Sequence, residues 1–347
     1  MVSPPETEDT PRTWFSRARR PILLLLLWLA LAGVFWARFR GELVAAVGLL
    51  PELRFAVLGA LCLFAAWTVV AANGWRTLLR SALPADCVTP SLHRLVMIRV
   101  QAQALNFILP TAGLAGESLR ALSAADDRDA VRGSVAAIVL DNVAMAVAGL
   151  TMSAAAVPLL LVAAREPWQV GILAGALLVV LGIGLERVPF SIARPLLRLL
   201  GSGSRLAGVL GILAEKRDLR PAHRRAVAWH LLERAISVGE VHVVMVALGV
   251  GATLADSTAI ASVFVLVSFA VFFVPAQLGV AEIAVVMACM SLGISPEVGI
   301  AIALVRRSRQ LLVCVLGLLL LLRARFAGGM QPGWSNHREA SRRGGLP

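Results

Sequence analysis

The chain has 347 residues, of which 58% are apolar and 16% are charged, and its mean hydropathy is +0.80. Soluble domains carry about 25% charged residues, so this composition excludes an ordinary soluble domain and indicates a polytopic membrane protein. The formal net charge of +12 comes mostly from arginines in the tails and between apolar runs. That is the positive-inside pattern of membrane proteins, and we expect no nucleic-acid partner.

Six segments are long and apolar enough to form membrane-spanning helices, which need about 20 residues each. In chain order they are 21–37, 55–73, 134–163, 168–186, 226–249 and 298–322. Basic residues place three polar segments on the cytoplasmic side, so both termini are expected inside. These segments are the tail 1–20, the loop 187–225 and the tail 326–347, of which the last is expected to be disordered.

Two further apolar regions, 92–123 and 258–294, are interrupted by helix-breaking residues. The first contains NFILPTAGLAGESLR (106–120) and the second contains FFVPAQLGVAEIAV (272–285). In each, a proline precedes a glutamate by seven residues, and the two copies are offset by 165. Proline ends a helix because it lacks the N–H group, and glycine permits non-helical backbone. The residues concerned are Pro110, Gly116 and Glu117 in the first region, and Pro275, Gly279 and Glu282 in the second.

The two matched breaks predict an inverted repeat, because the expected topology makes them enter the membrane from opposite sides. Repeat one covers about 55–163 and repeat two about 226–322. The predicted fold is an all-α integral membrane protein of six full spans and two broken regions. Each broken region is either a re-entrant hairpin or a pair of short spans. Broken helices in corresponding positions of inverted halves indicate a substrate site near the bilayer midplane.

Charged residues inside the apolar segments are the other candidates for this site, because such charges are costly in a membrane. Glu117 and Arg120 are one helical turn apart and can pair. Asp141 and Arg306 each follow a repeat glutamate by 24 residues, so we expect them to form an ion pair between the repeats. The predicted substrate-binding and translocation residues are Pro110, Gly116, Glu117, Arg120, Asp141, Glu240, Pro275, Gly279, Glu282 and Arg306.

Segment 226–249 carries a stripe of polar residues at steps of three or four, which lies on one helix face and is expected to point into the bundle or a polar cavity. Its members are His230, Glu233, Arg234, Ser237 and Glu240. A metal site here lacks a second histidine at ligand spacing. The sequence also has no HExxH, G-x-S-x-G or P-loop motif and no paired-cysteine motif. We therefore expect no catalytic residues, no metal and no cofactor, and a protein that is not an enzyme.

Several stretches resemble the lysylphosphatidylglycerol synthase transmembrane family, a flippase-like domain. They are NFILPTAGLAGESLRAL, FFVPAQLGVAEIAVV followed by LGISPE, and ALVRRSRQLL, and the resemblance covers about residues 20–325. Within the family, VAWHLLERAISVGEVHVVMVALG, GVAE and LVRRSRQLL are most similar to the membrane proteins associated with hopanoid biosynthesis. The AGLAGES stretch resembles the general flippase-like pattern as much as the hopanoid one.

The resemblance implies a multi-pass protein of the bacterial inner membrane that moves a lipid without ATP. The lipid is either a hopanoid or a phospholipid. Anionic lipids of the inner leaflet are expected to contact the basic loop, and an anionic headgroup is expected to seek Arg120 and Arg306. The alternative function is a non-transporting scaffold or regulator that binds lipid-biosynthesis enzymes. Lysyl transfer is not expected, because the soluble aminoacyl-transferase domain is not part of this sequence.

Overall fold

The computed structural model describes residues 40, 44, 54–109, 113–125, 127–200, 204–216, 218–271 and 279–326. Within these ranges the chain forms helices joined by turns, with no strand, and this confirms the predicted all-α class. The expected first span 21–37, both tails, Pro110 and Pro275 lie outside the described residues.

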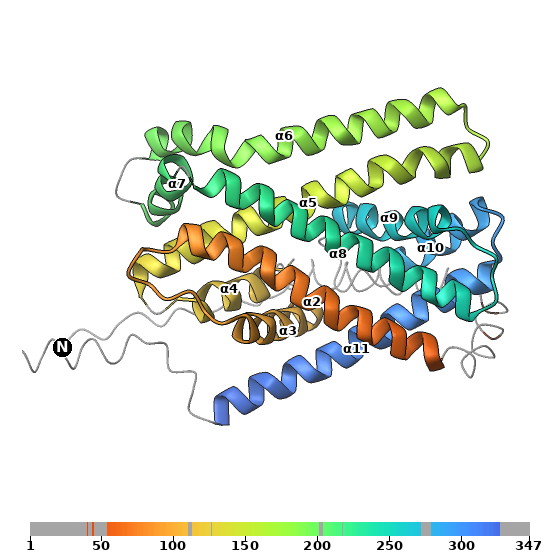
Figure 1. Cartoon of the computed structure of the whole chain (residues 1–347), viewed down its shortest axis with the longest axis horizontal. Helices are drawn as coiled ribbons and strands as arrows, with labels where there is room; N and C mark the ends of the chain where they lie inside the picture. The colour runs from red at the N-terminus through yellow and green to blue at the C-terminus, as the bar shows by residue number, and fades with distance from the viewer. Residues whose placement is uncertain are drawn as a thin grey trace, which may run out of the picture.

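The described part of the chain contains ten helices, labelled α2 to α11 in Figure 1. In chain order they are α2 (Arg54–Ala82), α3 (Leu92–Ile108), α4 (Leu114–Ser123), α5 (Arg128–Ala163), α6 (Trp168–Leu200), α7 (Arg205–Glu215), α8 (Leu219–Ala247), α9 (Leu254–Ala270), α10 (Val280–Ser291) and α11 (Pro296–Phe326). The long helices run roughly along one direction, as expected for a membrane bundle (Figure 1).

Three of the described helices are long and apolar enough to cross a membrane, judged by length and composition. They are α2, α5 and α6. The helices α8 and α11 are of similar length, 29 and 31 residues, and contain the expected spans 226–249 and 298–322. They differ from α2, α5 and α6 because charged residues interrupt their apolar sequence.

Side-chain caps explain why several helices begin where they do. The Ser91 hydroxyl accepts a hydrogen bond from the first turn of α3, and the Asp127 carboxylate does the same for α5. Thr253 and Asp256 form a reciprocal capping box at the start of α9. Each cap satisfies backbone N–H groups that a helix leaves without internal partners.

The predicted basic loop 187–225 is largely helical in the residues that the structure describes. Helix α6 continues to Leu200, α7 follows, and α8 begins at Leu219. The reason is apolar patterning, because Ala193 of α6 and the α7 residues Val209 and Leu213 are buried in a common core. The Lys216 ammonium then donates to the carbonyls of Ala82 and Leu83, which fastens the end of α7 to the end of α2.

The two predicted breaks are present, and each produces a pair of short helices. In the first, α3 ends at Ile108 and α4 begins at Leu114; in the second, α9 ends at Ala270 and α10 begins at Val280. Gly113 and Gly279 precede α4 and α10 with φ of 86° and 83°, a conformation that favours glycine. Figure 1 shows the two pairs toward opposite ends of the molecule.

Two apolar cores occupy these opposite ends. The first is formed by the end of α2, by α3, α4, the first half of α5, α7 and the start of α8. The second is formed by the start of α2, the end of α8, and α9, α10 and α11. Along α8, the residues from 219 to 226 belong to the first core and those from 238 to 245 belong to the second. The charged residues of α8 at 230, 233 and 234 therefore lie between the two cores.

Candidate functional site

Buried charged side chains gather beside each break. The first charge cluster draws on α3, α4, α5 and α8, which all pack against one another or against α2. Its members are Arg99, Glu117, Arg120, Asp141, His230, Glu233 and Arg234.

Asp141 is the centre of the first charge cluster. One carboxylate oxygen accepts from Arg99 at 3.1 Å and from Arg120 at 2.5 Å, and the other lies 2.9 Å from Nε2 of His230. The Asp141 side chain is 1% exposed, so its ionised form depends on these partners. Through them, one carboxylate ties α5 to α3, α4 and α8.

The α4 part of the cluster is held tightly against its neighbours. Arg120 donates to Glu117 at 2.8 Å, which confirms the predicted pair, and its guanidinium stacks over Trp75 at 4.4 Å. The backbone N–H of Gly116 donates to Oδ1 of Asn106 at 2.7 Å. A Cβ at Gly116 would lie 2.4 Å from the carbonyl oxygen of Ala102, so only glycine lets α4 approach α3 this closely.

His230 bridges two carboxylates. Its Nε2 faces Asp141 and its Nδ1 faces Glu233, and all three side chains are almost completely buried. A neutral imidazole has one N–H group. Both contacts are therefore hydrogen bonds only when the ring is doubly protonated or when one of the carboxyl groups carries a proton. Gly74 of α2 leaves room for the ring, because a Cβ there would lie 3.3 Å from Nε2.

The second charge cluster lies beside the other break and draws on α8, α10 and α11, with aromatic residues from α2 and α9. Its charged members are Glu240, Glu282, Arg306, Arg307 and Arg309. Glu282 pairs with Arg307 and also accepts from the backbone N–H of Gly279 at 2.8 Å. Both of its oxygens are thus engaged, one of them in capping α10.

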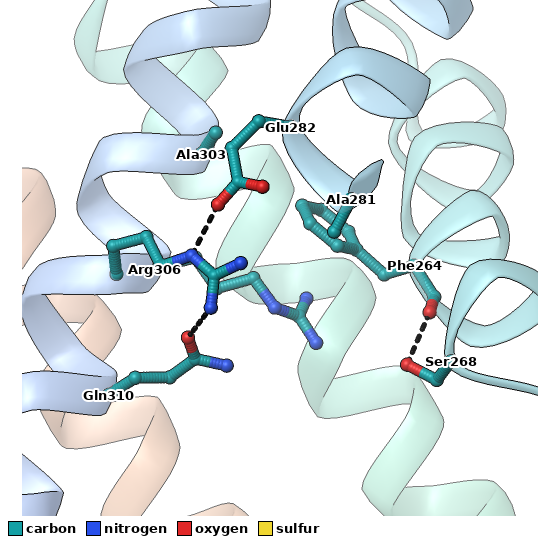
Figure 2. Close-up of a pocket in the computed structure, with 8 residues that line it drawn as sticks. Phe264, Ser268, Ala281, Glu282, Ala303, Arg306 and Gln310 are labelled. Carbon is teal, nitrogen blue, oxygen red and sulfur yellow. Dashed lines mark hydrogen bonds and ion pairs between the residues drawn. The ribbon is translucent and has the colours of Figure 1, made fainter. Parts of the chain in front are cut away.

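Arg307 and Arg309 pair with carboxylates, whereas Arg306 contacts an aromatic ring. Arg309 Nε lies 3.0 Å from Glu240 Oε1, and Arg307 contacts Glu282 and donates to Gln310 at 2.8 Å. In Figure 2, dashed lines mark these contacts of Arg307 to Glu282 and Gln310, and another marks the hydrogen bond from the Ser268 hydroxyl to the Phe264 carbonyl. Arg306 stacks over the Phe264 ring at 3.9 Å. Within the described residues it forms no ion pair and no hydrogen bond.

Beside Arg306 lies a cavity of about 60 Å³ between α9, α10 and α11. Its lining residues, shown in Figure 2, are Phe264, Ser268, Ala281, Glu282, Ala303, Arg306, Arg307 and Gln310. The cavity therefore combines an aromatic face with cationic, amide and carboxylate groups, and its lining is mostly polar.

The expected ion pair between Asp141 and Arg306 is wrong. Asp141 pairs with Arg99, Arg120 and His230, whereas Arg306 faces Phe264 and the cavity. The equal spacing from the repeat glutamates does not bring these two residues together, because pairing depends on which helices pack. Helix α5 packs against α4 and α8, and α11 packs against α3 and α10.

Helix α8 connects the two clusters, and its predicted polar face is present. His230, Glu233, Ser237 and Glu240 are all buried in the bundle. Glu233 belongs to the first cluster and Glu240 to the second, seven residues or about 10 Å further along the helix. A polar path thus follows α8 from one break to the other.

Sequence reasoning missed several functional candidates. Arg99 lies in the interrupted region 92–123 and is not among the predicted site residues, yet it is 6% exposed and reaches Asp141. Arg307 and Arg309 lie in the expected span 298–322 and are not among the predicted site residues either. The available signal was the triplet of arginines in ALVRRSRQLL, since charged side chains within an apolar run usually pair with polar groups of other helices.

The comparisons with known proteins agree with this membrane architecture. The family model described as the lysylphosphatidylglycerol synthase TM region matches residues 19–317. The comparison with curated proteins gives no match, and the comparison with solved structures gives none either. The family match spans most of the chain and includes every residue of both charge clusters. This chain is therefore a membrane protein that belongs to the lysylphosphatidylglycerol synthase transmembrane family.

Proposed function

We propose that this protein binds a membrane lipid and translocates it between leaflets without ATP, and that it is not an enzyme. The observation that carries the proposal is the pair of helix breaks at opposite ends of the bundle, each beside a buried charge cluster. A lipid headgroup needs polar contacts while it crosses the hydrocarbon region. The two clusters and the α8 face between them supply such contacts.

The cost of these charges supports a functional role. On insertion scales a charged residue at a helix centre costs roughly 2.5–3.5 kcal/mol, and such residues usually mark substrate or ion pathways. Arg99, Arg120 and Asp141 are each less than a tenth exposed. A bundle that needed only stability could replace a buried ion pair with apolar residues at little or no loss.

The short helices support re-entrant hairpins. At 1.5 Å per residue, α4 and α10 with 10 and 12 residues extend about 15 and 18 Å, against roughly 30 Å for the hydrocarbon core. Neither helix is long enough to span alone. We extend the proposal to an inverted repeat in which each hairpin enters from one side, with a substrate site near the midplane.

The family supports a lipid-related role, and two lipid classes remain in the proposal, hopanoids and phospholipids. The setting is the inner membrane of a bacterium with both termini in the cytoplasm, as the arginine distribution favours. The trio of Asp141, His230 and Glu233 is our candidate for proton coupling, because both of its bridges are hydrogen bonds only while the ring is doubly protonated or one carboxyl group carries a proton.

The test is a double variant, Glu117→Gln with Glu282→Gln, reconstituted into vesicles that contain fluorescent phospholipid and fluorescent hopanoid analogues. Glutamine keeps the size of each side chain but removes its charge and replaces one acceptor oxygen with an NH₂ donor. We expect at least a tenfold loss of translocation with the protein still folded, as checked by circular dichroism and gel filtration. The control is Glu166→Gln with Glu215→Gln, two exposed carboxylates outside both clusters, which should translocate at the wild-type rate.

A wild-type rate in the Glu117→Gln, Glu282→Gln variant would reject the site assignment. If wild-type vesicles move neither lipid faster than protein-free vesicles, translocation itself is rejected. The scaffold function would then be favoured, in which the protein positions lipid-biosynthesis enzymes. Co-purification of such an enzyme, unaffected by the double variant, would support it.

A further inference from the structure

We infer that the cavity between α9, α10 and α11 binds one singly charged phosphate group, with Arg306 as its principal ligand. This inference rests on the proposed lipid function and deepens it, because it names the headgroup chemistry. It favours a phosphodiester lipid over a hopanoid with an uncharged head.

The size of the cavity fits a phosphate group. A buried water needs roughly 10–15 Å³ by the same measure of volume, so about 60 Å³ holds four to six such positions. A phosphate group has five heavy atoms. The cavity therefore accommodates that group, while the remainder of a lipid would have to lie outside it.

The charge balance of the second cluster leaves one positive charge. Its three arginines face two carboxylates, and both carboxylates are engaged by arginines other than Arg306. Glu282 is further committed to Gly279, which caps α10. Glu240 also lines a smaller cavity together with Arg306, but no ion pair forms between those two. A single negative charge would complete the balance.

The donors that line the cavity suit an oxyanion. A guanidinium presents N–H groups in a planar fork that matches phosphate oxygens. The contact of the Arg306 guanidinium with the Phe264 ring, at 3.9 Å from the ring centre, holds this cation beside the cavity that both residues line. Gln310 accepts from Arg307 through Oε1, which leaves its NH₂ group as a second donor beside the cavity.

The first cluster has no arginine available to bind an anion in the same way. Arg120 was the other expected anion site, but it already donates to Glu117 and Asp141 and stacks on Trp75. Its cluster has as many carboxylates as arginines. An anion there would have to displace existing partners, whereas at Arg306 it displaces none among the described residues.

The experiment measures the thermal unfolding midpoint of the purified full chain in an uncharged detergent. Three probes are compared: dihexanoyl phosphatidylglycerol, dihexanoylglycerol without the phosphate, and inorganic phosphate. A ligand that binds only the folded state raises the midpoint with concentration. We expect the phosphatidylglycerol to raise it, and the uncharged dihexanoylglycerol to leave it unchanged.

Variants on α11 locate the site. Arg306→Gln should need at least ten times more phosphatidylglycerol for the same rise, and Arg306→Lys, which keeps the charge without the fork, should fall between. The matched control is Arg323→Gln, an exposed arginine on the same helix, which should respond as the wild type does. Arg306→Lys also keeps the test valid if the glutamine variant fails to fold.

Three results would overturn the inference. They are an unchanged response in both Arg306 variants, an equal response to dihexanoylglycerol, and a response to inorganic phosphate that matches or exceeds the lipid's, which would assign the site to the free ion. Failure of this inference is distinct from failure of the proposed function. Translocation that continues without phosphatidylglycerol binding rejects only the site, and binding without translocation rejects only the transport function.

Discussion

Both charge clusters are built from arginines and carboxylates, but they differ in how completely these charges are paired. In the first, Asp141 receives two arginines and a histidine, and every charged group has a partner at hydrogen-bonding distance. In the second, Arg306 lies against an aromatic ring and a cavity and forms no ion pair with any residue that the structure describes. The first cluster has as many carboxylates as arginines, whereas the described members of the second include one more arginine than carboxylates.

This difference distinguishes a cluster that holds helices together from one that can bind an anion. A buried ion network that is fully paired resists change, because removing any member strands its partners in a medium of low dielectric constant. A cation without an anion binds one at lower cost, since no existing pair must be broken. In the proposed function, the α3–α4 break is the fixed side of the bundle and the α9–α10 break is the side that binds the ligand.

Asp141→Asn should break the complete cluster and produce the largest loss of stability. The change leaves Arg99 and Arg120 buried without their shared carboxylate, and stranding one partner of a buried pair costs about 3–5 kcal/mol. The loss is measured by denaturant unfolding in detergent. Asp129→Asn is the control, because its pair with Arg132 is exposed and should contribute about 0–1 kcal/mol. Equal losses in the two variants would contradict the account of Asp141.

Gly116→Ala should disturb the same cluster without changing any charge. A Cβ at 2.4 Å from the Ala102 carbonyl forces α4 away from α3, and overpacking of this kind typically costs about 1–3 kcal/mol. Gly184→Ala in α6 is the comparison, because nothing lies within 4 Å of a Cβ there. That control should be neutral or slightly stabilising, since alanine is the better helix former. The free energy of unfolding of the two variants is compared by denaturant unfolding in detergent, and equal values would contradict the close approach of α4 to α3.

Arg306→Gln should have the smallest effect on stability and mark the second cluster as different. Because Arg306 forms no ion pair with any described residue, the change should alter the free energy of unfolding by less than about 1 kcal/mol, or raise it. Arg120→Gln should destabilise the protein clearly more, since it removes a partner from both Glu117 and Asp141. A large loss in Arg306→Gln would show that this arginine has a structural role.

The local features of the site were predictable from the sequence. The proline–glutamate spacing located both breaks, and the three-residue step predicted the pairing of Glu117 with Arg120. The polar face of α8 followed from helical periodicity, because positions three and four apart share a face. Each of these depends on residues close together in the chain.

The partners across helices were not predictable in this way. The offset between the repeats suggested Asp141 with Arg306, but the rotation and packing of distant helices decide such pairs. The same limit hid Arg99, whose side chain crosses to α5 from the interrupted region 92–123. The basic segment 187–225 was predicted as a loop from its charge. Its apolar residues are spaced for helices, and the segment contains the end of α6, all of α7 and the start of α8.

The most direct test of the central claim is mass spectrometry of the lipids that co-purify with the protein in a mild detergent. Wild type is compared with Arg306→Gln and with the variant carrying Glu117→Gln and Glu282→Gln. The account predicts one phosphodiester lipid class enriched in the wild type over the bulk membrane and lost in Arg306→Gln. Bulk membrane composition in all three proteins would contradict a lipid site at the breaks.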